Sequence, residues 1–206
     1  MKRIVVILLV FLAAVVSVPH AYAEQDVGQI LNELNLARTE PARYAQFLKE
    51  RRVYYKGNIY GTGEGMTFTT DEGVRAVDEA IAFLEKAKPV EPLMLSGRLS
   101  EAAMALVRSS GPTGNTGHNS AGGMTFDKRV AMYGMWKMCI GEDISYGPTV
   151  PREIVVQLII DDGVKSRGHR TNIFNSDYKV AGIACGAHKD YGYMCVIDFA
   201  GSFKAK

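Results

Sequence analysis

The sequence predicts an α+β protein in which helices pack against a small antiparallel sheet. Apolar residues recur at helical spacing in several segments before residue 111. Later in the chain, two alternating runs at 178–187 and 191–201 are joined by "HKDYG" and predict a hairpin. A further strand is expected at 136–147, so the sheet has about three strands.

Three helices are expected in the first half of the chain. The apolar residues of 26–38 follow helical spacing and predict the first. Thr39 is expected to cap the second helix, which Pro41 opens. Thr69 and Glu72 form a capping box that predicts the start of the third.

Glycine-rich stretches separate the elements that follow. Residues 57–68 contain four glycines and predict a surface loop, with a lid over 52–68 as the alternative. A fourth helix is expected at 99–110, before a glycine-rich loop at 111–123. Thr125 then caps a short helix that stops at Gly134.

The last elements before the hairpin are a strand and a helix. The strand at 136–147 is expected to be interrupted at Gly141. Pro151 opens the helix, Glu153 lies in its first turn, and Gly163 ends it.

The N-terminus has the pattern of a signal peptide. Lys2 and Arg3 precede an apolar run at 4–16, and Ala-Tyr-Ala follows at 21–23. The apolar run is short for a membrane span of about 20 residues, so a retained anchor is the less favoured alternative. We therefore expect residues 1–23 to be removed and the protein to be secreted, either extracellular or periplasmic.

The remaining residues, 24–206, are expected to form a single domain without a stable membrane span. Losing Lys2 and Arg3 lowers the 24 basic residues to 22, equal to the 22 acidic ones. This balance argues against nucleic acid as a partner, because such binding needs a basic surface. It does not indicate an oligomeric state.

Three cysteines are expected to meet an oxidising compartment. In the predicted hairpin, Cys185 and Cys195 lie opposite each other, which favours a disulfide between them. A pairing that uses Cys139 and three reduced, buried thiols are the alternatives.

A few side chains outside the signal peptide could carry chemistry. His118 lies in a glycine-rich loop, His169 follows a buried helix, and His188, in the hairpin turn, is expected to be solvated. Glu142 follows a glycine in a strand, where its side chain can be directed into a cleft. Asp161 falls at the inner edge of the helix that leads to His169.

Four segments in this order carry a family resemblance: "TGHNSAGGMTFDKRV", "GEDISYG", "SRGHRTNIF" and "YGYMCVIDFAG". They resemble the motifs of the CAP superfamily, which comprises cysteine-rich secretory proteins, venom allergens and pathogenesis-related proteins. The likeness covers about residues 26–201 and is greatest to the bacterial secreted branch, called SCP-like. It implies an α-β-α sandwich with a wide cleft that holds two histidines and two acids.

The resemblance assigns four residues to this cleft. His118 matches the first histidine, Glu142 the glutamate of the glycine-glutamate-asparagine motif, and His169 the glycine-histidine motif. Asp161 is the best match for the acid on the helix.

This sequence departs from the family pattern at two of these positions. Asp143 replaces the usual asparagine. The helix acid is an aspartate, one methylene shorter than usual, and Asp162 beside it is a rival for the role.

Two neutral imidazoles, a carboxylate and an open position suit zinc or another divalent ion. One hypothesis is therefore a metal held by His118 and His169, with Glu142 as a ligand or as the acceptor that orients a ring. The alternative is a structural hydrogen-bond network that ties loops together.

The resemblance implies a protein that binds a small ligand, with lipids or sterols as the suggested class. A metal-dependent hydrolase, acting on protein or cell wall with Glu142 as general base, is the second hypothesis. The sequence lacks the His-Glu-x-x-His motif of zinc proteases and the Gly-x-Ser-x-Gly elbow of α/β-hydrolases. Arg167 and Arg170 either attract an anionic ligand or, as we expect, fix a loop.

Overall fold

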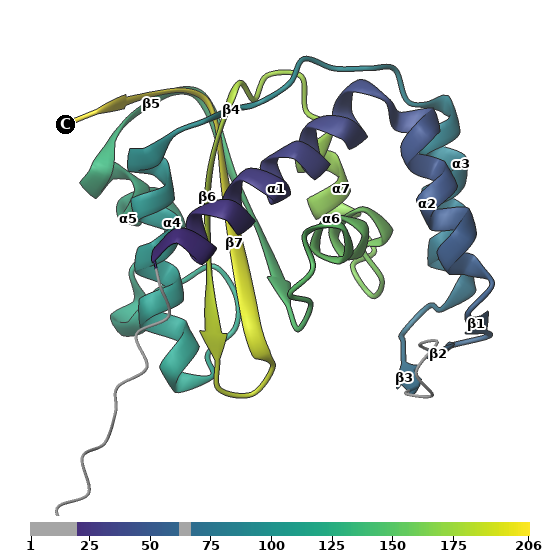
Figure 1. Ribbon diagram of the computed structural model, residues 1–206. Coiled ribbons are helices and arrows are strands. Elements are labelled where there is room, and N and C mark those ends of the chain that lie inside the picture. Colours follow the sequence, from purple (N-terminus) through teal and green to yellow (C-terminus); the bar gives the residue numbers. More distant parts are fainter. Residues whose placement is uncertain (1–19, 62–66) are drawn as a thin grey trace, which may run out of the picture.

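The computed structural model describes residues 20–61 and 67–206 (Figure 1). The predicted signal peptide, residues 1–23, lies outside them except for its last four residues, whose backbone begins helix α1. Within the described residues, no helix combines the length and apolar character that crossing a bilayer requires.

A four-stranded sheet forms the centre of the molecule. Its strand order is β4-β6-β7-β5, with antiparallel pairing of β7 to both β6 and β5. These strands are β4 (Met94–Leu95), β5 (Gly134–Tyr146), β6 (Val180–His188) and β7 (Gly192–Ala205). The three expected antiparallel strands are confirmed. The fourth strand, β4, was not predicted. It pairs parallel to β6 and has two residues, which is too short to give a recognisable sequence pattern.

Helices cover both faces of this sheet (Figure 1). One face carries α4 (Gly97–Ser110) and α5 (Phe126–Tyr133). Five helices lie on the other side: α1 (His20–Thr39), α2 (Pro41–Arg52), α3 (Val74–Lys86), α6 (Pro151–Ile160) and α7 (Gly168–Ile173). The predicted α-β-α sandwich is therefore correct.

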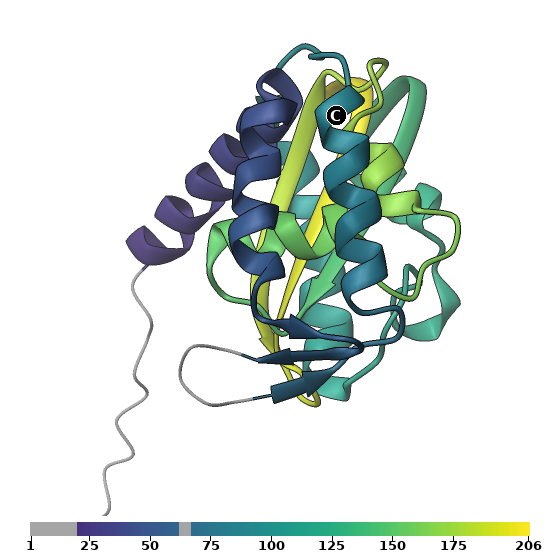
Figure 2. The same ribbon diagram turned by 90° about the vertical axis from the view of Figure 1, so that its right-hand side faces the viewer.

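Separate apolar clusters fill the two interfaces of the sheet. Ile183, Ile197 and Phe199 pack toward α1, α3 and α6, whereas Ala184 and Val196 pack toward α4. Successive strand residues point to opposite faces, which explains why neighbours such as 183 and 184 join different clusters. The α2 and α3 helices lie side by side at the outside of the larger cluster (Figure 2).

The predicted cap of the second helix is wrong by one residue. Thr39 remains in α1, where its hydroxyl donates to the carbonyl of Asn35 over 2.7 Å. Glu40 occupies the capping position, and Pro41 opens α2 as expected. Threonine can bond to the preceding helical turn as well as to a following one, so its identity does not fix the boundary.

The predicted capping box at the start of α3 is also wrong. Thr69 lies in a strand, and Gly73, with φ of +64°, precedes the helix. The amides of residues 71–73 donate instead to the carboxylate of Asp162, at 2.7 to 3.1 Å. A residue about 90 positions away in the chain thus holds the turn that leads into this helix.

The stretch at 57–68, expected as a loop, contains strands. A second sheet is formed by β1 (Tyr55–Lys56), β2 (Ile59–Gly61) and β3 (Thr67–Thr69), antiparallel in that order. Gly57, with φ of +60°, makes the turn between β1 and β2. Tyr60 packs between the rings of Tyr55 and Phe68, so cross-strand aromatic contacts outweigh the glycine content.

Strand β5 is irregular, but not where Gly141 predicts. Its register against β7 shifts between Lys137 and Ile140, and Met138 has φ of +71°. Gly141 pairs regularly with Phe199. Its missing side chain instead admits Tyr178, whose hydroxyl occupies the space a Cβ would take.

The disulfide between Cys185 and Cys195 is confirmed. The two residues are direct partners in the β6–β7 register, with Cα atoms 4.0 Å apart. Cys139 stays a free, half-buried thiol.

The approach of α4 to β6 is expected to tolerate only glycine at position 182. A Cβ there would lie closer than 3.0 Å to backbone atoms of Leu99 and Ser100. Gly182→Ala should lower the free energy of unfolding by about 1–3 kcal/mol, because backbone must move. Gly28→Ala, in an open position of α1, should be neutral or stabilising by up to about 1 kcal/mol. Urea denaturation of both variants checks this, and equal stabilities would contradict it.

Candidate functional site

His118 lies in the loop between two short 3-10 helices, η1 (Gly111–Thr113) and η2 (Ala121–Gly123). The amide of Gly117 donates to the hydroxyl of Tyr146 over 2.9 Å. The carbonyl of His118 accepts from the guanidinium of Arg129 over 3.0 Å. These bonds attach the glycine-rich loop to β5 and α5, while the His118 side chain remains 55% exposed.

His118 and Glu142 form a first histidine–carboxylate dyad. The ring Nδ1 lies 2.8 Å from Oε1 of Glu142, a side chain that is 1% exposed. The other carboxylate oxygen, Oε2, forms an ion pair with Arg129. Both oxygens of Glu142 are therefore engaged, and its carboxylate acts on the ring rather than on solvent.

The base of this dyad contains a second buried acid. Asp198 lies opposite Glu142 in the β5–β7 register and is fully buried, with Arg129 at 3.8 Å. Burial raises the pKa of Asp198 well above its usual range, and the neighbouring Glu142 raises it further. One arginine thus faces two buried acids.

His169 and Asp161 form a second dyad of the same kind. Asp161 Oδ1 lies 2.6 Å from Nδ1 of His169, and Oδ2 accepts from the His169 amide over 3.0 Å. The Asp161 side chain is fully buried and that of His169 is 24% exposed. Helix α6 ends at Ile160 rather than at Gly163, because Asp161 adopts a left-handed backbone with φ of +56°.

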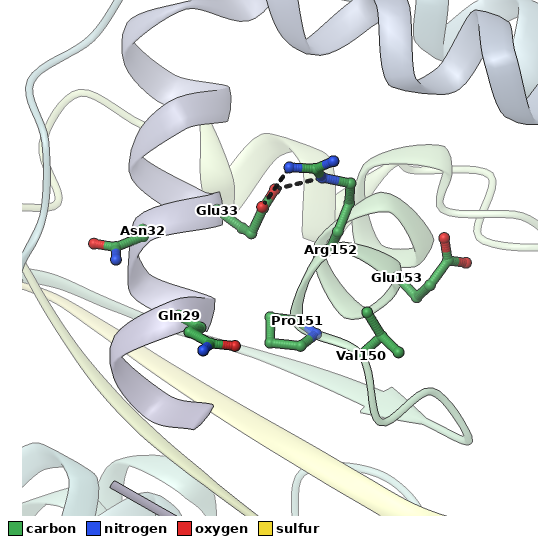
Figure 3. A pocket seen from close by; sticks show the side chains of 7 residues that line it. All are labelled: Gln29, Asn32, Glu33, Val150, Pro151, Arg152 and Glu153. Carbon is green, nitrogen blue, oxygen red and sulfur yellow. Dashed lines mark hydrogen bonds and ion pairs between the residues drawn. The ribbon is translucent and has the colours of Figure 1, made fainter. Parts of the chain in front are cut away.

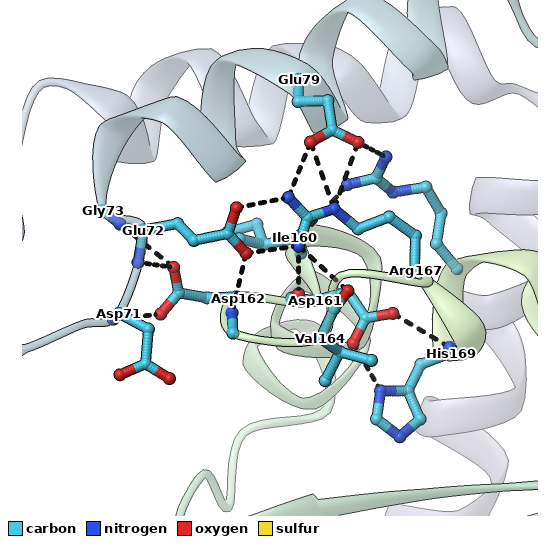
Figure 4. A network of polar contacts seen from close by, with 12 residues as sticks. Asp71, Glu72, Gly73, Glu79, Ile160, Asp161, Asp162, Val164, Arg167 and His169 are labelled. Carbon is cyan, nitrogen blue, oxygen red and sulfur yellow. Dashed lines mark hydrogen bonds and ion pairs between the residues drawn. The ribbon is translucent and has the colours of Figure 1, made fainter.

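The loop between the helices α6 and α7 is held by two arginines (Figure 4). Arg167 donates to the carbonyl of Asp161 and to the carboxylates of Glu72 and Glu79. Arg170 donates to the carbonyls of Ile159 and Ile160 and to Glu79. They fix the loop, as expected of them.

Of the two rival aspartates, only Asp161 contacts a histidine. Asp162 points the other way and binds the amides of the turn before α3, as described above (Figure 4). The left-handed turn at Asp161 directs these adjacent carboxylates to different partners.

Asp143 lies between the two dyads. It follows Glu142 on β5 and accepts from Nδ2 of Asn172 over 2.7 Å. Asn172 is three residues beyond His169, so it lies on the same side of α7. Adjacent strand residues face opposite sides, and the dyads consequently lie on the two faces of one edge strand.

Burial shifts the pKa of Asp143. It raises the pKa of the Asp143 carboxyl well above its usual range, and Asp161 and Glu142 raise it further, although the bond from Asn172 lowers it. Its second oxygen, Oδ2, has no partner among the described residues. A protonated carboxyl at this position resembles asparagine in shape and in having a donor.

Sequence reasoning missed Arg129, Asp198 and Asn172, and it misplaced His188. The signal for Asp198 was present, since an acid stands within the apolar run "CVIDFAG". His188 is buried rather than solvated: its Nε2 contacts the carbonyl of Asn115, and its ring packs near Tyr146.

Two hollows in the described surface lie away from the dyads. The larger, of about 450 Å³, lies between α1 and the start of α6, where Arg152 reaches across to Glu33 (Figure 3). The other, of about 310 Å³, is lined by Glu101, Met104, Arg108 and Tyr133. Neither includes a dyad residue.

Comparison with known proteins identifies the family. The model of the cysteine-rich secretory protein family, CAP, matches residues 31–199. The chain belongs to the CAP family. A search of the curated proteins gives no match.

Two solved structures are similar to this CAP domain. One is an extracellular protein containing an SCP domain from Bacillus anthracis, with 14% identity and a TM-score of 0.43. That match covers 62% of this chain and 37% of the other, so the chain spans well under half of that protein. The second is an outer surface protein from Borrelia burgdorferi, with 20% identity, a TM-score of 0.45, and coverage of 57% and 80%.

The first dyad predicts a measurable pKa. The bond to Glu142 raises the pKa of His118, against opposing effects of burial and Arg129. Glu142→Gln removes the charge, so the pKa should fall below the ordinary value of about 6.5. Histidine ring NMR against pH measures it, with a thermal melt as control for folding. An unchanged pKa would show that Glu142 does not set the basicity of this ring.

The raised pKa of His118 also determines how stability depends on pH. Because the folded-state pKa of His118 is raised, its protonation contributes stability that is present below about pH 6.5 and lost as pH rises through the folded value.

Asp143 predicts a trend of the same sign, starting at lower pH, and allows an isosteric test. Its raised pKa means that stability falls as pH rises from about 4, the unfolded value, through the folded value. Asp143→Asn removes the titrating proton and should flatten this fall. Melting temperatures across pH measure it, with the exposed Asp177→Asn as control. Parallel curves for wild type and Asp143→Asn would disprove the protonated state.

Proposed function

We propose that this CAP protein is exported and binds a small ligand along the edge of β5 that pairs with no described strand, between His118 and His169, with lipids as the candidate class. The signal-peptide pattern at 1–23 supports export, to the medium or to the periplasm. The family supports a binding role over an established reaction, since one fold carries different activities in different members.

One observation carries the proposal. In both dyads Nδ1 is held by a buried carboxylate, and in the described part of the chain no protein atom bonds either Nε2. A carboxylate accepts the Nδ1 proton, so a neutral ring presents Nε2 as a bare acceptor. A protonated ring presents a charged donor instead. Hydroxyl and carboxylate groups, such as those of lipid heads, match these two states.

Whether a divalent metal fits this site depends on how many ligands the side chains supply. Zinc takes four ligands, of which a protein site supplies at least three. Among the described residues, no three His, Cys, Asp or Glu side chains form such a group. The metal expected at His118 and His169 therefore stays a prediction, and the proposed binding does not use one.

The geometry also favours binding over hydrolysis. A general base must reach the water that it activates. The two oxygens of Glu142 contact His118 and Arg129, and its side chain is 1% exposed. This carboxylate is arranged to orient a ring.

Palmitate tests the proposed site with a defined probe. Isothermal titration should show binding to the wild type that weakens roughly 10-fold or more in each of His118→Gln and His169→Gln, through loss of a charge-assisted hydrogen bond. Asn119 is an exposed neighbour of His118 whose side chain makes no hydrogen bond to the described residues, so Asn119→Ala should bind palmitate as the wild type does.

Native mass spectrometry of the protein recovered after export extends the test to other ligands. An added mass retained by the wild type and lost in the double variant His118→Gln/His169→Gln is expected. No palmitate binding together with no added mass, or the same mass in both proteins, would refute the proposal.

A further inference from the structure

Four large, exposed apolar side chains lie within seven residues, where α5 ends and β5 begins. We call Met132, Met135, Trp136 and Met138 the methionine patch. Their exposed fractions are 60%, 58%, 39% and 76%. Single exposed apolar residues are ordinary, whereas four in one short segment make it a candidate contact region.

The patch lies on a two-stranded ribbon at the end of the sheet. The start of β5 pairs with the end of β7 (Figure 1), and the register places Met135 opposite Lys204 and Trp136 opposite Phe203. Because neighbouring strand residues point to opposite faces, the ribbon carries an exposed apolar side chain on each face. The amide of Lys206 donates to the carbonyl of Tyr133, which ties the ribbon to the last turn of α5. Met132, in that turn, is thereby brought to the same region.

The backbone at Met138 is strained to expose this side chain. Its φ of +71° is one of three positive values among the described non-glycine residues. A left-handed residue costs roughly 1 kcal/mol or more when it is not glycine. A methionine kept in this conformation, with 76% of its side chain in solvent, indicates a role for the exposed side chain.

Lysines flank the patch, and acids are few near it. Lys128 lies one helical turn before Met132, and Lys137 and Lys204 lie on the ribbon. Residues 128–140 and 201–206 contain no aspartate or glutamate, and the exposed Asp127 lies beside Lys128. Asp177 is the acid next to the inner end of the ribbon, near Cys139.

We propose that the methionine patch docks the protein onto the surface of an anionic phospholipid bilayer. Tryptophan and methionine enter the boundary between headgroups and acyl chains, while lysine stems lie along them and keep their charges at the phosphates. Charge complementarity favours a lipid surface over a second copy, because a symmetric contact would bring the lysines together.

This docking is independent of the histidine dyads. It uses other residues and needs no ligand at His118 or His169. The variant His118→Gln/His169→Gln should therefore bind vesicles as the wild type does, so that either proposal can fail alone.

The single tryptophan of the chain, Trp136, reports directly on the patch. The protein recovered after export is titrated with vesicles of equal phosphatidylglycerol and phosphatidylcholine, and with pure phosphatidylcholine. Co-sedimentation and a blue shift of the fluorescence are expected with the anionic vesicles only. Binding should weaken as salt is added, because the lysine contribution is screened.

Matched charge variants locate the contact. Replacing the three lysines near the patch should weaken vesicle binding roughly 100-fold, because each lysine contributes about a factor of five. This variant is Lys128→Gln/Lys137→Gln/Lys204→Gln. A control with the same charge change, at the exposed Lys86, Lys88 and Lys165, should bind like the wild type. Met132→Ser/Met135→Ser should reduce both binding and the blue shift.

Four outcomes would overturn the proposal. They are no binding to anionic vesicles, equal loss in both lysine variants, binding without a change in Trp136 fluorescence, and a dimer abolished by Met132→Ser/Met135→Ser in protein that ignores vesicles. The last would assign the patch to a second copy.

Discussion

The buried ion pair between Arg129 and Glu142 is the interaction on which the candidate site depends. The guanidinium belongs to α5 and the carboxylate to β5, and the same guanidinium holds the carbonyl of His118. Removing one member of such a pair costs about 3–5 kcal/mol, because the remaining charge stays buried without a partner. The pair therefore fixes helix, strand and glycine-rich loop together, and the position of His118 follows from it.

Arginine side chains also hold the second dyad in place. The last turn of α6 leaves carbonyls without helical partners, and Arg170 bonds two of them while Arg167 bonds that of Asp161. Glu79 on α3 forms ion pairs with both arginines, and Glu72 pairs with Arg167. Charged side chains here stabilise backbone turns. The Nε2 of His169 is left without a bond to any described protein atom.

Sequence patterns predicted what depends on local periodicity, and they failed where contacts come from afar. The helices, the hairpin and its disulfide follow from apolar spacing and alternation, which few tertiary contacts can reverse. The turn that leads into α3 did not follow, because Asp162, distant in sequence, binds its amides. Arg129 was likewise invisible as a site residue, since its partners lie on a loop and a strand that only folding brings together.

Backbone strain offers a further view of how the chain is organised. The non-glycine residues with positive φ in the described chain are Met138, Asp161 and Arg167. Two of them direct side chains within the loop of the second dyad, and the third directs a methionine outward at the irregularity of β5. Each conformation costs free energy that glycine or asparagine would reduce. At Asp161 and Arg167 the side chains make hydrogen bonds that offset this cost, whereas the strained Met138 places its side chain in solvent.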